Sequence, residues 1–316
     1  MKQYDVVCAG LSVVNFPVFP VDKFIFENDV NPVEPIELLS GGDAANQSIV
    51  LSRMGAKTAL LTRRGDDDFG LIMLELLKKF GHDIDLSGIS VDPVKATSVC
   101  AMMIKPDGHR HFVSHKGAMF DFAVDHIDLS ILSRTKIASI GGLFGLPSFD
   151  GDGSLRFFQE AKKQGVITVA DTKSDLMKIG LNGIREMLPF TDYFFPSYDE
   201  ASVLSGETDP KRIAQVFLDA GAANTGIKLG SDGCYFANAS QQFTVPVIPQ
   251  KVVDTTGAGD NFMSGFIMGL LRGWEPRQCC LFGTAAATLC VAEIGPNLAV
   301  TSYKQVDDFL KKSGLV

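Results

Sequence analysis

The sequence predicts an α/β fold in which a mostly parallel, doubly wound sheet is flanked by helices and carries a small additional β-sheet. Buried-type strands alternate with amphipathic helices over most of the 316 residues, a pattern typical of a parallel sheet covered on both faces. Two segments, at about 12–39 and 94–118, interrupt this alternation, and both have β-type sequences. No internal repeat, low-complexity tract or flexible linker divides the chain, so we expect one domain over residues 1–316.

The N-terminal half begins with a buried strand from Tyr4 to Gly10. The segment 12–39 has prolines, several phenylalanines and no helical pattern, so we expect an irregular, partly extended excursion there. The elements that follow are a helix from about 43 to 54 ended by Gly55, a strand at 57–62, a helix at 68–80, and strands at 96–105 and 110–116. Pro-Asp-Gly-His joins the last two strands and is a hairpin signal.

The C-terminal half repeats the alternation almost to its end. We expect strands near 137–143, 166–171, 192–196, 225–229 and 233–237. We expect helices near 153–164, 198–205, 210–220, 276–292 and 302–313. The two interrupting segments are most simply placed together, as a small sheet that emerges from one edge of the main fold.

Composition excludes several classes of function. The net charge of −8 argues against a nucleic-acid surface and against a basic membrane anchor. No apolar run is long enough to span a bilayer, and the N-terminus enters a strand without a secretory signal. The six cysteines include no Cys-x-x-Cys pair and lie mostly in apolar patterns, as expected for reduced, buried thiols. We therefore expect a cytoplasmic protein without nucleic-acid or membrane partners.

The stretch 252–273 carries most of the chemistry. A β-type run ends at Asp254, the chain then passes through Gly257 and Gly259, and apolar residues at helical spacing follow. A glycine turn that feeds a helix leaves backbone N–H groups without intrahelical partners and forms an anion site. A lone carboxylate in a first turn, such as Asp260, usually only complements the helix dipole, worth about 0.3–1 kcal/mol. Beside an anion site, it suits the proton acceptor of a phosphoryl transfer to an alcohol, which depends on positioning and charge stabilisation.

The run Asp-Thr-Thr-Gly-Ala-Gly-Asp at 254–260 resembles the second signature of the ribokinase-type (PfkB) carbohydrate kinases. This resemblance implies a ribokinase-like fold in which the small sheet is a lid over the sugar. It also implies that Asp260 is the catalytic base, that Gly257, Ala258 and Gly259 form the anion hole, and that ATP and Mg²⁺ are the cofactors. Lid sheets of the family often form dimer interfaces, so a homodimer through the lid is a further implication.

The segment from Gly41 to Asn46 resembles the first signature of the same family. The resemblance implies that Gly42, Asp43 and Asn46 hold the sugar, since glycines admit a polyol to the backbone and an amide both donates and accepts hydrogen bonds. Taken alone, this segment is better explained as a strand-to-helix turn in which Asn46 is a solvated helix residue.

The family usually carries an Asp near the end of the first strand that binds two sugar hydroxyls, and the matching position here is Asn15. The resemblance therefore implies that Asn15 and Asp260 also contact the sugar. A second sugar-binding acid, expected at 142–144, is also absent. These departures argue against a plain ribose pocket and admit a different ring or a sugar acid. Lys116 and Arg110, in the second lid segment, either face such an acid or are solvated.

Three further segments resemble the nucleotide side of the family. Ser197-Tyr198-Asp199-Glu200 matches Asn-x-x-Glu except for its serine, which implies Mg²⁺ near Glu200 through water; the alternative is a pair of first-turn helix acids. Lys228 precedes a Gly-x-x-Gly loop and would reach a phosphate as a point charge. The implied ATP-binding residues are Ser197, Glu200, Lys228, Gly230, Gly233, Gly257, Gly259 and Gly283. No Gly-x-x-x-x-Gly-Lys-Ser/Thr motif is present, which excludes a P-loop kinase.

In the family, an Asp at the position of Asp254 often helps to hold a monovalent cation, but Ala299 lacks the hydroxyl expected downstream, so potassium stays an open prediction. The resemblance as a whole implies an ATP- and Mg²⁺-dependent kinase that phosphorylates a hydroxyl of a small sugar or sugar acid. Two alternatives remain. One is a nucleoside kinase of the same fold, with lid aromatics stacked on a base, and the other is a non-catalytic sugar or nucleotide sensor.

Overall fold

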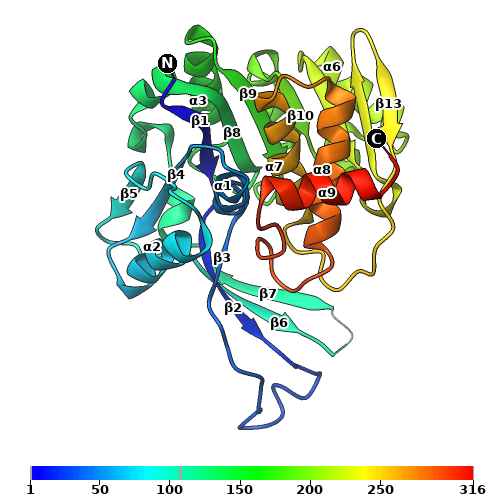
Figure 1. The fold of residues 1–316 in the computed structure, drawn as a ribbon. Coiled ribbons are helices and arrows are strands. Elements are labelled where there is room, and N and C mark those ends of the chain that lie inside the picture. Colours follow the sequence, from blue (N-terminus) through cyan, green and yellow to red (C-terminus); the bar gives the residue numbers. More distant parts are fainter. Residues whose placement is uncertain (1, 107–108, 316) are drawn as a thin grey trace.

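The computed structural model describes residues 2–106 and 109–315 and confirms the predicted α/β fold (Figure 1). The strands of its large sheet are β1 (Tyr4–Gly10), β4 (Thr58–Gly65), β5 (Ile89–Asp92), β8 (Thr135–Leu143), β9 (Ile167–Thr172), β10 (Tyr193–Phe195), β11 (Asn224–Lys228), β12 (Cys234–Asn238) and β13 (Gln242–Val245). They lie in the order β13-β12-β11-β10-β9-β8-β1-β4-β5. The strands from β11 to β5 pair in parallel, whereas β12 and β13 extend one edge in antiparallel pairing.

Helices cover both faces of this sheet because successive residues of a strand point to opposite sides. On β1, Val6 and Cys8 enter one hydrophobic core, and Val7 and Ala9 enter a second. The first core packs against α1 (Asp43–Arg53), α2 (Asp68–Phe80), α7 (Ala258–Leu271), α8 (Pro276–Cys290) and α9 (Tyr303–Lys312). The second packs against α3 (Asp152–Lys163), α4 (Gly180–Ile184), α5 (Tyr198–Ser205) and α6 (Pro210–Asp219). Short 3₁₀ turns lie at Gly117–Asp121, Val124–His126, Leu129–Arg134, Leu188–Phe190 and Gly230–Asp232.

The two segments that interrupt the alternation form a separate small sheet, as predicted. Its strands are β2 (Val13–Val18), β3 (Leu39–Gly41), β6 (Val99–Ile104) and β7 (Arg110–His115), in the order β3-β2-β6-β7. The sheet projects from the lower end of the main body in Figure 1. Asn15, Cys100 and Ser114 lie opposite one another on β2, β6 and β7, so their side chains share one face of it.

Several local predictions were wrong. The short elements β5, β13 and α4 had not been predicted, whereas the segment 12–39 is partly extended as expected and contributes β2 and β3. The run that ends at Asp254 is not a strand, because the amides of Val253 and Asp254 donate to the carbonyl of Val291 at the end of α8 instead of joining a sheet. The predicted hairpin turn at 106–109 lies partly outside the described residues.

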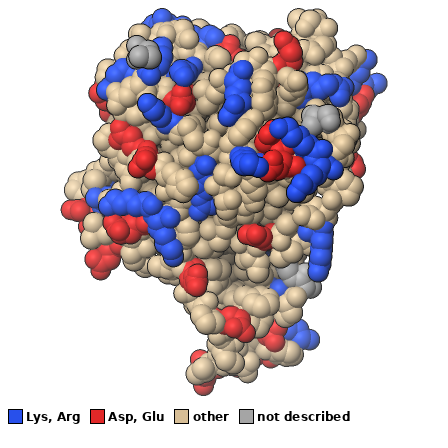
Figure 2. Space-filling model, in the orientation of Figure 1, with Lys and Arg blue, Asp and Glu red and all other residues tan. Residues whose placement is uncertain are grey.

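Figure 2 shows lysines, arginines and acids interspersed on one face, without a continuous basic patch there. All six cysteines are buried free thiols, as expected. In the described part of the chain, no helix combines the length and the apolar character that crossing a membrane requires.

Candidate active site

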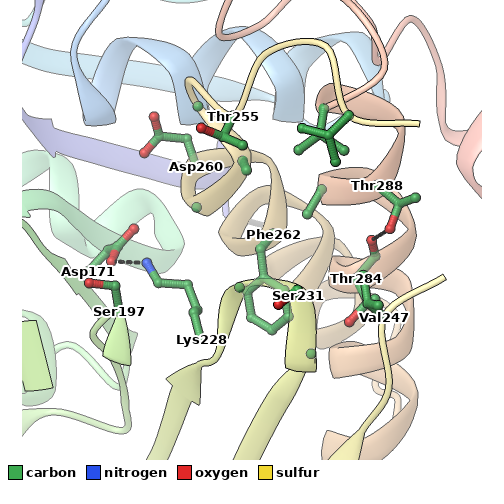
Figure 3. Close-up of a pocket in the computed structure, with 18 of the residues that line it drawn as sticks. Asp171, Ser197, Lys228, Ser231, Val247, Thr255, Asp260, Phe262, Thr284 and Thr288 are labelled. Atoms are coloured by element: carbon green, nitrogen blue, oxygen red, sulfur yellow. Dashed lines mark hydrogen bonds and ion pairs between the residues drawn. The ribbon is translucent and has the colours of Figure 1, made fainter. Parts of the chain in front are cut away.

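A cavity of about 610 Å³ opens at the edge where the parallel strands end. Ligands of open α/β sheets bind at this edge because the loops that follow the strands leave a crevice there. The walls come from the ends of β9 and β11, the start of α5, residues 247–252, the start of α7 and one face of α8 (Figure 3). Asp43, at the start of α1, closes the side nearest β1.

The start of α7 presents backbone N–H groups to this cavity. Gly257 precedes the helix in a left-handed conformation (φ 75°), and a Cβ there would lie 2.2 Å from the Pro296 carbonyl oxygen, so only glycine fits. No side chain caps the helix start, and the amides of Gly259 and Asp260 have no acceptor among the described residues. Two free amides at a helix N-terminus form an anion site, and the cavity gives an anion access to it.

Asp260 lies in the first turn of α7 and is 5% exposed. Its Oδ2 accepts a hydrogen bond of 2.7 Å from Asn46 Nδ2, and Asn46 Oδ1 accepts one of 2.8 Å from Asn297 Nδ2. Asn297 thereby orients the Asn46 amide so that its NH₂ group faces the carboxylate. Burial raises the pKa of Asp260 well above its ordinary value, Asp43 and Asp171 raise it further, and Asn46 and Lys228 oppose the shift.

Among the expected sugar-binding residues, Asn15, Gly42 and Asn46 do not line the cavity, whereas Asp260 and Asp43 do. Asp43 also carries an unpaired acceptor. Its Oδ2 is buried and has no hydrogen-bond partner among the described residues, so a ligand hydroxyl could supply the missing donor. Asn46 lies behind Asp260, as its hydrogen bond requires. The backbone of Gly42 packs against the backbone of Leu11. The Asn15 amide packs on Gly41, because a Cβ added to Gly41 would lie 2.0 Å from Asn15 Nδ2.

The expected nucleotide-binding residues line the cavity, with one exception. Those that do are Ser197, Glu200, Lys228, Gly230, Gly233, Gly257 and Gly259. Gly283 does not line it and lies where α7 packs on α8, because a Cβ there would be 2.7 Å from the Phe262 carbonyl oxygen. The polar residues that α8 does present are Thr284 and Thr288, which the sequence analysis had not assigned (Figure 3).

Glu200 has a structural function in addition to its place on the wall. Its Oε2 accepts hydrogen bonds from the Ser197 amide at 3.0 Å and from Thr172 Oγ1 at 2.8 Å. Ser197 in turn accepts from the amide of Glu200, which completes a capping box at the start of α5. Glu200 is therefore a first-turn helix acid, as the alternative prediction stated. It also lines the cavity, as the prediction of a site near Mg²⁺ requires.

Sequence reasoning missed an ion pair that lines the cavity. Asp171, at the end of β9, pairs with Lys228, at the end of β11, and their side chains are 4% and 13% exposed (Figure 3). Burial raises the pKa of Asp171 to about 6 against the opposing effect of Lys228. Burial alone would lower the pKa of Lys228, but Asp171 and Glu200 outweigh it and raise this pKa. The sequence did contain a signal for Asp171: the polar residues Asp171 and Thr172 directly follow apolar residues at the end of a predicted parallel strand.

Asp254 connects the small sheet to the start of α7. It forms an ion pair with Arg110 of β7, and it accepts hydrogen bonds from the amides of Thr256 and Gly295, both at 2.9 Å. Arg110 also donates to Thr255 Oγ1 at 2.8 Å. These bonds outweigh the effect of burial and lower the pKa of Asp254. Arg110 is therefore neither solvated nor directed at a substrate, and it neutralises the carboxylate that had been considered for a monovalent cation.

The model of the pfkB family of carbohydrate kinases matches residues 3–302. An uncharacterised sugar kinase of Archaeoglobus fulgidus is 30% identical over 249 residues, which cover 78% of this chain and 95% of that protein. A 5-dehydro-2-deoxygluconokinase of Clostridium perfringens is 24% identical over 98% of this chain and 94% of its own length.

Solved structures show the same fold. Arabidopsis thaliana ribokinase complexed with ribose and ATP aligns with a TM-score of 0.81 at 25% identity, over 98% of this chain and 99% of that one. A putative ribokinase II of E. coli in complex with ATP and Mg²⁺ aligns with a TM-score of 0.84 at 23% identity, over 98% of this chain and 100% of that one.

Proposed function

The chain belongs to the pfkB family of carbohydrate kinases, and from this premise we propose that it transfers the γ-phosphate of ATP to a hydroxyl of a small sugar, with Asp260 as the general base. The observation that carries the proposal is the position of Asp260. Its carboxylate lies at the cavity beside two free amides of the same helix start, and Asn46 holds it by a hydrogen bond of 2.7 Å.

Each part of this arrangement has a function in the proposed reaction. Asp260 accepts the proton of the attacking hydroxyl, and its raised pKa makes it a better proton acceptor near neutral pH than an ordinary carboxylate. Within the expected anion hole at 257–260, the free amides of Gly259 and Asp260 stabilise the charge on the phosphoryl group as it passes from ADP to the sugar. Asp43 accepts a hydrogen bond from a second hydroxyl and so orients the acceptor.

Mg²⁺ belongs to this proposal as the ion that accompanies ATP, and it would supply charge neutralisation between the phosphates. No group of three or more His, Cys, Asp or Glu suited to a metal occurs among the described residues. The protein would therefore hold the ion mainly through the nucleotide, with Glu200 reaching it through water. A potassium ion at Asp254 would have to displace the Arg110 guanidinium, and comparing turnover in KCl with turnover in choline chloride tests for one.

The acceptor class that we propose is a sugar or a sugar acid. Lys173 and Asp43 both line the cavity, and they approach Gly145 and Gly142, which both lie beside Leu11. Lys116 comes directly after β7 of the small sheet. Burial lowers the pKa of Lys116, and the positive charge of nearby Lys173 lowers it further. Neither ammonium group has a carboxylate partner among the described residues. An acceptor carboxylate would supply that partner. The name of the Clostridium perfringens relative, a 5-dehydro-2-deoxygluconokinase, also points to this class.

We extend the proposal to the assembly and location of the protein. The small sheet would act as a lid over the acceptor, and exposed apolar side chains of the sheet and of the β2–β3 connection, which include Phe112 and Phe26, would form a homodimer contact. Six buried free thiols are consistent with a reducing cytoplasm. Sedimentation of the wild type and of a Phe26→Ser, Phe112→Ser variant tests the dimer.

ADP release from Mg-ATP against a panel of hexoses, pentoses, sugar acids and nucleosides tests the activity. We expect a sugar or sugar acid to be turned over, and Asp260→Asn to lower kcat by about 10²–10⁴-fold with ADP affinity nearly unchanged. Asp68→Asn is a matched control, because Asp68 is an exposed acid in the first turn of α2 and contributes only about 0.3–1 kcal/mol through the helix dipole. Preference for a nucleoside would favour the nucleoside kinase, and ligand binding without ADP release would favour the sensor.

A further inference from the structure

The Asp171–Lys228 ion pair joins the ends of two strands that are not neighbours, since β10 lies between β9 and β11. Both side chains line the cavity, although both are almost completely buried. The backbone of Lys228 is fixed on the β10 side. Its amide donates to the Pro196 carbonyl at 3.0 Å, and Lys228 and Ser197 form an isolated parallel β-bridge. The backbone contacts and the ion pair with Asp171 together hold the ammonium group at a defined place in the cavity lining.

That place is directly beside the anion site. A Cβ added to Gly259 would lie 3.2 Å from Lys228 Nζ and 4.0 Å from Asp171 Oδ2. The ammonium thus approaches the same helix start that presents the free amides, and Figure 3 shows it directed toward Asp171. The absence of a side chain at Gly259 leaves the space between ammonium and helix open.

A purely structural pair would be poorly placed here. Burying two charges costs more desolvation energy than a single contact usually returns, so a buried pair is weak evidence for stability. This pair also faces a cavity lined by three other carboxylates, those of Asp43, Glu200 and Asp260. A phosphate that entered such a cavity would be repelled unless a cation met it, and Lys228 is the cavity-lining ammonium next to the anion site.

We propose that Lys228 is a catalytic residue that binds the transferring phosphoryl group together with the amides of the α7 start, and that Asp171 is a positioning residue that holds the Lys228 ammonium in place. This inference rests on the proposed function. In the reaction, a bond forms between the sugar oxygen and the γ-phosphorus, and the bond from that phosphorus to the β–γ bridging oxygen breaks. The hydroxyl proton goes to Asp260, and Lys228 keeps its own proton throughout, in line with its raised pKa.

A charge-removal cycle separates this function from a structural one. Lys228→Met should lower kcat by about 10²–10³-fold, as loss of one transition-state donor does. In the double variant Asp171→Asn, Lys228→Met, no unpaired buried charge remains, so a merely structural pair would recover near-wild-type kcat. We expect the double variant to stay as slow as Lys228→Met and Lys228→Arg to recover part of the rate. Near-normal turnover in the double variant overturns the proposal.

Nucleotide binding supplies a readout that does not depend on the acceptor. Lys228→Met should weaken binding of the non-hydrolysable β,γ-imido analogue of ATP by about 10–100-fold, the value of a charge-assisted hydrogen bond, and should change ADP affinity by less than about threefold. Equal loss for both nucleotides, or for neither, contradicts a γ-phosphate contact. If the wild type phosphorylates no sugar but this selective loss is seen, the proposed function fails and the phosphate contact stands.

Discussion

Replacing Asn46 with alanine should slow the enzyme much more at low pH than at high pH. The Asn46 amide donates at 2.7 Å to Asp260, and both side chains are buried, at 4% and 5% exposed. This bond favours the ionised form of Asp260 and so opposes burial, Asp43 and Asp171, all of which raise its pKa. Without the bond, the pKa of Asp260 rises further, and a smaller fraction of the enzyme carries the base at a given pH.

The magnitude follows from the type of bond. A hydrogen bond to a charged group contributes about 1.5–3 kcal/mol, and about 1.4 kcal/mol is a factor of ten. On the acid side of the profile, kcat/KM of Asn46→Ala should therefore fall by about 10–100-fold. At high pH both enzymes carry ionised Asp260, and only a difference from any direct sugar contact of Asn46 remains.

The assay is kcat/KM for the acceptor against pH, at saturating Mg-ATP, because its acid limb reports the base of the enzyme before the acceptor binds. Asn297→Ala is the matched control. It removes the 2.8 Å bond that orients the Asn46 amide but leaves the donor to Asp260 in place, so it should move the limb in the same direction by less. A loss of equal size at every pH would refute the assignment of Asp260 as the base held by Asn46.

Three further changes have distinct expected outcomes. Gly257→Ala should lower kcat by about 10²-fold through loss of the anion site, because the new Cβ would lie 2.2 Å from a carbonyl oxygen. Gly273→Ala is the control: Gly273 is also left-handed but has no atom within 4 Å of its Cβ position, so the change should cost only about 1–2 kcal/mol of stability. Equal kinetic effects of the two changes would contradict this prediction. Arg110→Ala should break the contact between the small sheet and Asp254. Both the KM of the acceptor and the rate of ATP hydrolysis without acceptor should then rise, because the lid closes less well. If both values stay unchanged, Arg110 has no function in lid closure. Burial raises the pKa of Asp150 to about 7, so the folded protein loses stability as pH rises through about 4 to 7 and this carboxyl ionises. Asp150→Asn should therefore raise Tm by a few degrees at pH 8 and leave it nearly unchanged at pH 4. An equal change in Tm at both pH values would assign the effect to packing.

The fold was predictable because its signals are local. The buried strand Tyr4–Gly10 and the amphipathic helix Asp68–Phe80 begin and end where periodicity and glycines indicate. The β-type run before Gly257 misled because the chain there satisfies its amides at the Val291 carbonyl, a partner that no periodicity reveals.

The candidate site was predictable where a contiguous motif carries it and not where it depends on contacts between distant segments. The turn and helix start at 257–260 stand together in the sequence, and the structure places them at the cavity. The partnership of Asn46 with Asp260 joins residues 214 positions apart, and that of Asp171 with Lys228 joins residues 57 apart. Gly283 was assigned to the nucleotide because the sequence alone does not distinguish a glycine that lets two helices pack closely from a glycine that admits a ligand.

The most direct test of the central claim follows phosphorus itself. When the wild type is mixed with Mg-ATP and the acceptor found in the panel, ³¹P NMR should show one new sugar phosphate monoester for each ADP formed, and Asp260→Asn should form neither on the same timescale. Inorganic phosphate in place of the ester, or an Asp260→Asn enzyme that forms the ester at nearly the wild-type rate, would contradict the account.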